Sequence, residues 1–156
     1  MLKTIAKILS PALKLFDFLI PVGDLTARVW VAQIFFVAGL TKIQSWASTM
    51  YLFNYEYTVP FLPPEIAAYI GTGAELVLPV LLVLGLGGRI TTFIFFMYNV
   101  IAVISYPFLW TDQGTHGLYQ HVNWGLLLML LMLHGSGKLS LDYWIRKKYG
   151  YMMEPA

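Results

Sequence analysis

The sequence predicts an all-α integral membrane protein, a four-helix bundle with interfacial amphipathic helices at its N-terminal and C-terminal ends. Composition is the first reason. Of the 156 residues, 58% are hydrophobic and only 12% are charged, whereas soluble domains carry about 25% charged residues. The second reason is that four apolar stretches are each close to the ~20 residues that a helix needs to cross the hydrocarbon core. Backbone groups in hydrocarbon must be satisfied internally, so these stretches are expected to be helices.

The predicted spans define the domain organisation. They cover residues of about 25–46, 65–86, 90–109 and 118–134. We expect a four-transmembrane-helix domain over residues 23–137, preceded by an amphipathic interfacial helix over residues 1–22 and followed by a basic interfacial tail over residues 138–156. The chain has no cysteine, which excludes disulfides and Cys-ligated zinc or iron–sulfur sites within it.

The N-terminal segment has the pattern of a helix that lies on a membrane surface. Its polar residues fall on one helical stripe: Lys3, Lys7, Ser10, Lys14 and Asp17. Apolar residues occupy the other side, so the lysines can face anionic head groups while the apolar side enters the bilayer. Pro11 is expected to bend or restart this helix. A plain topological anchor is the alternative interpretation.

Lysines and arginines outside the spans set the predicted orientation. They lie in the N-terminal segment, in the second connection at Arg89, and in the tail, where Ser140 is expected to cap a short helix with Asp142 in its first turn. With four spans these basic segments share one side of the membrane, and that side is the cytoplasm. We therefore expect a multi-pass protein of a bacterial or archaeal-type cytoplasmic (inner) membrane with both termini cytoplasmic. The net charge of +2 is too small to indicate a nucleic-acid partner.

The first outer connection is long and rich in aromatic residues: Trp46, Tyr51, Phe53, Tyr55, Tyr57 and Phe61. Amphipathic rings favour the membrane–water interface, so this connection is expected on the outer membrane surface. Capping a cavity and docking a partner are the alternatives.

Three ionisable residues lie inside the apolar stretches: Arg28, Lys42 and Glu75. A charge at bilayer depth costs at least about 2.5–3.5 kcal/mol, so it usually faces the bundle interior and marks a functional site. Counting about 1.5 Å per residue from the cytoplasmic end, Lys42 and Glu75 lie at depths of roughly 27 and 21 Å, and Arg28 at only about 6 Å. We predict a Lys42–Glu75 pair, direct or bridged by water or ligand, with Arg28 near the membrane boundary. A buried pair that only fixes helix register is the alternative.

Two further polar residues lie in the third and fourth spans. Asn99 is expected to form an interhelical hydrogen bond, and His121 lies at a depth similar to that of Lys42. A cluster of Lys42, Glu75 and His121 would be proton-active, because histidine titrates near neutral pH. His121 and His134 project about 140° apart on one helix, so they cannot ligate one metal together. No metal site is predicted.

At three places the sequence resembles the DoxX family of small membrane proteins, over roughly residues 28–142. The stretch from Arg28 to Lys42 is similar to the family's Arg…Phe…Ala-Gly…Lys signature. Glu75, a Leu-Gly-Leu turn at residues 84–86 and the following Arg89 resemble the second part of the pattern. The segment from Gly135 to Asp142 resembles the family's Gly-x-Gly-(Arg/Lys)-x-Ser-(Leu/Ile)-Asp terminator.

The resemblance implies a four-helix inner-membrane protein with cytoplasmic termini. Some relatives are subunits of thiosulfate:quinone oxidoreductases, and others associate with redox-stress partners. We therefore expect a membrane subunit of a redox-linked, quinone-interacting oxidoreductase complex, rather than a self-sufficient enzyme. The alternative is a non-enzymatic accessory, assembly or partner-docking protein. Four spans without visible repeats argue against a solute carrier.

The expected site follows from these residues. The candidate ligand-binding residues are Arg28, Lys42, Glu75, Asn99 and His121, of which Glu75 and His121 are the proton-active candidates. No intrinsic cofactor is expected, and quinone is the ligand to consider. The expected partners are the lipid bilayer and either another protein or a second copy of this chain.

Overall fold

The computed structural model describes residues 2–150, with side chains described from residue 10 onward except at residue 12. The chain folds into helices in this order: α1 (Leu2–Gln44), α2 (Trp46–Tyr55), α3 (Pro64–Leu84), α4 (Gly88–Ser105), the 3-10 helix η1 (Pro107–Trp110), α5 (Thr115–His134) and α6 (Leu141–Tyr149). The described residues form no β-strand, and the predicted all-α class is confirmed.

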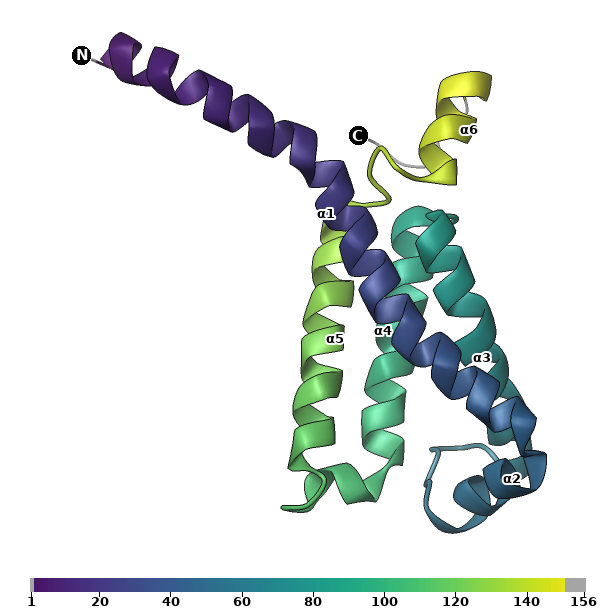
Figure 1. Ribbon diagram of the computed structural model, residues 1–156. Helices are drawn as coiled ribbons and strands as arrows, with labels where there is room; N and C mark the ends of the chain where they lie inside the picture. The colour runs from purple at the N-terminus through teal and green to yellow at the C-terminus, as the bar shows by residue number, and fades with distance from the viewer. Residues whose placement is uncertain (1, 151–156) are drawn as a thin grey trace.

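Helices α1, α3, α4 and α5 are the long elements, and they lie side by side in Figure 1. Helix α3 packs mainly on α1, and α4 packs mainly on α5. Their shared core consists of apolar residues from all four: Val31, Ala32, Phe35, Leu78, Leu82, Phe95, Leu128 and Leu131. The N-terminal half of α1 and helix α6 lie at one end of the molecule, which we call the terminal end; α2 lies at the other, the α2 end (Figure 1).

Three of the described helices have segments long and apolar enough to cross a membrane: Leu13–Gln44, Pro64–Leu84 and Gly88–Ser105. The protein is therefore a multi-pass membrane protein. Helix α5 has a sufficient length of 20 residues, but polar residues in its first half, such as Gln120 and Asn123, make it less apolar. That α5 is a fourth span stays a prediction.

The N-terminal segment and the first predicted span belong to one continuous helix. Helix α1 runs through 43 residues, and Pro11 and Pro21 lie inside it without ending it. A proline removes one backbone hydrogen bond, which bends a helix more readily than it stops one when the flanking residues remain helical. The N-terminal half of α1 projects away from the other helices (Figure 1). The side chains of Lys3 and Lys7 lie outside the described residues, so the amphipathic interpretation stays a prediction.

Two predicted helix ends need correction. The aromatic connection begins with the ten-residue helix α2, and α1 ends at Gln44, two residues before the expected end of the span. Helix α4 ends at Ser105 and not near Leu109, because Pro107 follows. A proline disfavours helical backbone in the preceding residue, and Tyr106 has φ −113° and ψ 91°, an extended conformation.

The segment after α5 returns the chain to the α3–α4 turn. The predicted cap of the last helix is confirmed, since Ser140 Oγ accepts a hydrogen bond from the Tyr143 amide at 3.2 Å. Asp142 Oδ1 accepts a hydrogen bond from the Gly87 amide at 3.3 Å. Gly87 has φ +73°, a left-handed conformation that suits glycine. Helix α6 is thereby held against the turn that joins α3 to α4.

Candidate functional site

The predicted partners Lys42 and Glu75 form a direct ion pair between α1 and α3. Lys42 Nζ lies 2.7 Å from Glu75 Oε1 and 2.6 Å from Oε2. Their side chains are only 13% and 9% exposed. Opposite charges at this distance and burial interact far more strongly than on a water-exposed surface.

Glycine at position 39 permits this pair. A Cβ atom at Gly39 would lie 2.9 Å from Leu76 Cδ2 and 3.0 Å from Glu75 Cβ. Small residues at helix interfaces in membranes let backbones approach closely. The backbone of α1 therefore packs directly on α3 one turn before Lys42.

Tyr98 on α4 is a third member of the group that the sequence did not single out. Its hydroxyl lies 3.0 Å from Glu75 Oε1 and 3.2 Å from the Gly71 carbonyl oxygen. The single hydroxyl proton can be donated to one or the other. The polar tip of a tyrosine in an apolar helix is the signal that could have identified it.

The Lys42–Glu75–Tyr98 group lies on the wall of a cavity of about 370 Å³. The cavity is bounded by α1, α3, α4 and α5, with α2 and its connection to α3 closing the α2 end. Most of the lining is apolar or aromatic, including Phe35 and Trp124. A largely apolar cavity with a few convergent polar groups is the usual form of a small-molecule site.

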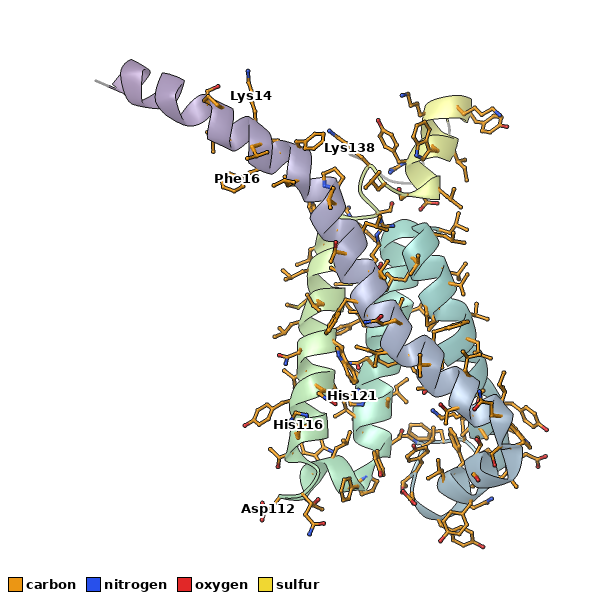
Figure 2. The ribbon with its side chains drawn as sticks, viewed as in Figure 1. Lys14, Phe16, Asp112, His116, His121 and Lys138 are labelled. Atoms are coloured by element: carbon orange, nitrogen blue, oxygen red, sulfur yellow. The ribbon has the colours of Figure 1, made fainter. Side chains whose placement is uncertain are left out.

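His121 also lines the cavity, from α5. Its Nδ1 lies 2.8 Å from Asn99 Oδ1, and Asn99 Nδ2 donates to the His121 carbonyl oxygen at 3.0 Å. Since the Asn99 amide nitrogen is committed to that carbonyl, its oxygen accepts, and His121 Nδ1 is the donor. Nε2 is then left as the acceptor of a neutral ring. In Figure 2, His121 lies farther from the α2 end of the molecule than His116 and Asp112 do.

Asn99 itself does not line the cavity. It is 3% exposed and holds His121 in place from α4. The structure thus confirms the interhelical hydrogen bond expected of Asn99. Asn99 is a positioning residue, because it holds His121, and His121 lines the cavity.

The aromatic connection, helix α2 together with the segment that joins it to α3, forms part of the cavity wall. Phe53, Tyr57 and Leu62 line the cavity, and the Thr58 amide donates to the Ser105 carbonyl oxygen at 2.7 Å. Burial, with smaller contributions from neighbouring acidic and phenolic groups, raises the pKa of Tyr57 to about 12, so its hydroxyl stays protonated. Phe53, Tyr57 and Leu62 thus cap the cavity, which was one of the alternative interpretations of this connection. Tyr51 and Tyr55 are exposed.

Arg28 lies apart from this cavity, near the terminal end. It is 2% exposed, and its guanidinium donates to the carbonyl oxygens of Val83 at 3.4 Å and Leu139 at 2.5 Å. These contacts join α1 to the end of α3 and to the segment before α6. The structure does not bring Arg28 together with Lys42, Glu75 and His121, and its contacts are structural.

A model of the family described as DoxX matches residues 23–107, which is more than half of the chain. The chain belongs to the DoxX family. A second model, described as "TQO small subunit DoxD", matches residues 67–154 of this DoxX protein. The first match includes Lys42, Glu75 and Tyr98, and the second includes His121.

One curated relative is a Haemophilus influenzae protein described as uncharacterized. It is 29% identical over 136 residues, covering 82% of this chain and 86% of the relative. No solved structure gives a significant match.

The structure also shows a polar pair at the terminal end of this DoxX protein that the sequence did not indicate. His134 Nδ1 lies 3.0 Å from Asp24 Oδ1 and links α5 to α1. The two residues are 110 positions apart, so only the tertiary fold brings them together.

Proposed function

We propose that this DoxX protein is the membrane subunit of a redox-linked oxidoreductase complex, and that its cavity binds a quinone. We place it in the cytoplasmic membrane with four spans and cytoplasmic termini. The observation that carries the proposal is the apolar cavity of about 370 Å³ with a buried Lys42–Glu75–Tyr98 group on its wall. The match to the family described as "TQO small subunit DoxD" supports a role within an oxidoreductase complex.

The cavity suits the shape and polarity of a quinone ring. Ligand cavities commonly measure about 300–1,000 Å³, and a flat apolar ring can pack against Phe35 and Trp124. A quinone carbonyl needs a hydrogen-bond donor, and Lys42 Nζ on the cavity wall has three N–H groups, of which Glu75 accepts two. The residues present therefore fit the proposed ligand.

The chemistry of a quinone is reversible uptake of two electrons and two protons. In the proposed complex the partner subunit exchanges the electrons, and this chain's own residues manage the protons. Glu75 is the carboxylate that can hold a proton in the cavity wall, next to the Tyr98 hydroxyl. His121 can accept a proton at Nε2, because Asn99 occupies Nδ1.

Binding can be tested by tryptophan fluorescence. Trp124 lines the cavity, so a quinone bound there should quench its emission in reconstituted bilayers. We expect saturable quenching that Trp124→Phe largely removes and Trp30→Phe preserves, because Trp30 is 56% exposed and does not line the cavity. Equal, non-saturating quenching of both variants would indicate dissolved quinone only and would contradict the proposal.

Quinone reduction by the purified complex with its partner subunit is a second test. Glu75→Gln keeps the side-chain size but removes the titratable group, and proton transfer by a positioned group contributes about 10²–10⁴-fold. We expect quinone reduction to fall by at least about 100-fold while complex assembly is unchanged. Normal turnover with normal assembly would favour an accessory or docking role.

A further inference from the structure

The cavity has a mouth on the side of the molecule. Among its lining residues only three have exposed side chains: Leu62 (39%), Ile70 (56%) and Ile101 (44%). They come from the α2–α3 connection, α3 and α4, respectively. All three are apolar, so the mouth between α3 and α4 is apolar as well.

The packing of the helices explains why the mouth lies there. Helix α3 makes most of its contacts with α1, and α4 makes most of its contacts with α5, whereas α3 and α4 contact each other less. The cavity-lining residues of these two helices near the mouth include the small residues Ala67, Gly71, Ala102 and Ser105. Small side chains on two loosely packed helices leave space between them.

The mouth lies farther toward the α2 end than the polar group. Ile70 precedes Glu75 by five residues on α3, and Ile101 follows Tyr98 by three residues on α4, so the offsets along the helices are roughly 7.5 and 4.5 Å. Both helices are among those long and apolar enough to span a membrane. In a bilayer crossed by both helices, their exposed apolar side chains at this level would face lipid, and the mouth would open into lipid.

We propose that the cavity takes its ligand directly from the membrane through this mouth, and that the ligand is an amphiphile with a long apolar chain. The polar head contacts Lys42, Glu75 and Tyr98, and the chain passes between Ile70 and Ile101 into the bilayer. The inference rests on the proposed function and narrows the ligand to a quinone with a hydrocarbon side chain.

The cavity has one more polar residue, Ser105, at the end of α4. Its side chain is buried and lines the cavity, and its hydroxyl has no hydrogen-bond partner among the described residues. Buried polar groups are normally hydrogen-bonded. Ser105 follows Tyr98 by seven residues, roughly 10.5 Å along α4, so it is a second polar point of the cavity, beyond the mouth from the Lys42–Glu75–Tyr98 group.

The absence of cysteine from the chain permits a test by site-specific obstruction. Single variants Ile70→Cys and Ile101→Cys are alkylated with N-cyclohexylmaleimide in detergent and then reconstituted into bilayers. The matched controls are Val77→Cys and Ile94→Cys, which lie seven residues away on the same helix faces, are exposed, and do not line the cavity. Quenching of Trp124 then reports occupancy by a quinone with a long isoprenoid chain and by the same ring without a chain.

We expect alkylation at 70 or 101 to raise the concentration of long-chain quinone needed for half-maximal quenching by at least about tenfold, a loss of about 1.4 kcal/mol of binding. Binding of the chainless ring should stay the same, and the controls should bind both quinones normally. If long-chain quinone binds all four alkylated variants equally, or if both quinones are lost together, the chain does not occupy this mouth. If neither quinone quenches Trp124 in the unmodified protein, the proposed function itself fails.

Discussion

At the scale of single residues, the Lys42–Glu75 pair depends on more than opposite charge. Withdrawing each ion from water costs several kcal/mol, and attraction compensates only when the geometry is good and further hydrogen bonds are made. Lys42 Nζ reaches both carboxylate oxygens, and the Tyr98 hydroxyl supplies one more bond. Removing one partner therefore leaves the other charge buried without its counter-ion.

A double-mutant cycle should reveal this coupling. We expect Lys42→Met alone to lower the free energy of unfolding by roughly 3 kcal/mol, because Glu75 would be left unpaired. Glu75→Leu should cost a similar amount, and the double variant should cost much less than the sum of the two. Unfolding in mixed detergent, followed by circular dichroism, measures these differences.

The control for the cycle is Lys138→Met, which removes an exposed lysine at the terminal end (Figure 2). It should change stability by less than about 0.5 kcal/mol. Additive effects of Lys42→Met and Glu75→Leu would show that the two side chains do not interact in the membrane.

Asn99 should determine the tautomer of His121. In the intact protein, nitrogen NMR should show a proton on Nδ1 and a bare Nε2, because Asn99 Oδ1 accepts from Nδ1. Asn99→Ala should remove this preference and cost about 1–3 kcal/mol, because it leaves buried groups without partners. Asn123→Ala, at an exposed position on α5, is the matched control. An unchanged tautomer in Asn99→Ala would contradict the assignment.

The site was partly predictable from single residues. Depth counting along two antiparallel helices paired Lys42 with Glu75, because the rise per residue is fixed by helix geometry. Tyr98 escaped the prediction because the interhelical hydrogen bond expected of Asn99 turns that residue inward, and adjacent helix residues point about 100° apart. How far a helix is rotated about its axis is decided by packing, which no single helix reveals.

At the scale of elements, the approach of α1 to α3 depends on a glycine. A Cβ at Gly39 would meet Glu75 and Leu76 at about the distance that real Cβ atoms avoid. We expect Gly39→Ala to cost about 1–3 kcal/mol, because the helices must move apart next to the ion pair. Thermal unfolding of the reconstituted protein would measure the loss.

Gly73→Ala is the matched control for this prediction. Gly73 lies on α3, and apart from its chain neighbours and its own helix backbone no heavy atom of the described residues lies within 4 Å of its hypothetical Cβ. The substitution should therefore cause no loss of stability. Similar losses at both positions would show that helix contact is not the reason for glycine at position 39.

Element boundaries were less predictable than element types. Pro107 ends α4, yet Pro11 and Pro21 are contained within α1. One residue type thus has two outcomes, because a lost backbone bond can be tolerated where helix continues on both sides. The segment around Pro107 instead turns into η1 toward α5, so the tertiary path of the chain decides which prolines end a helix.

At the scale of the whole molecule, α5 determines the topology. It runs antiparallel to α4 and returns the chain from the α2 end to the terminal end, where the N-terminal half of α1 also lies (Figure 1). Its polar residues are concentrated in its first half, where His116 and Gln120 bond each other at 3.1 Å. These residues would lie at the interface if α5 crosses the membrane, while its second half is as apolar as the other spans.

This arrangement predicts which connections are reachable from outside the cell. Because the chain lacks cysteine, unique thiols can be placed at Asp112, in the α4–α5 connection, and at Lys148, near the end of α6. An impermeant thiol reagent added to intact cells should label Asp112→Cys and the outer control Tyr55→Cys, but should label Lys148→Cys only after lysis. Labelling of Lys148→Cys in intact cells would mean that the chain crosses the membrane three times. Helix α5 would then lie outside the bilayer, which is incompatible with its packing along the apolar helix α4.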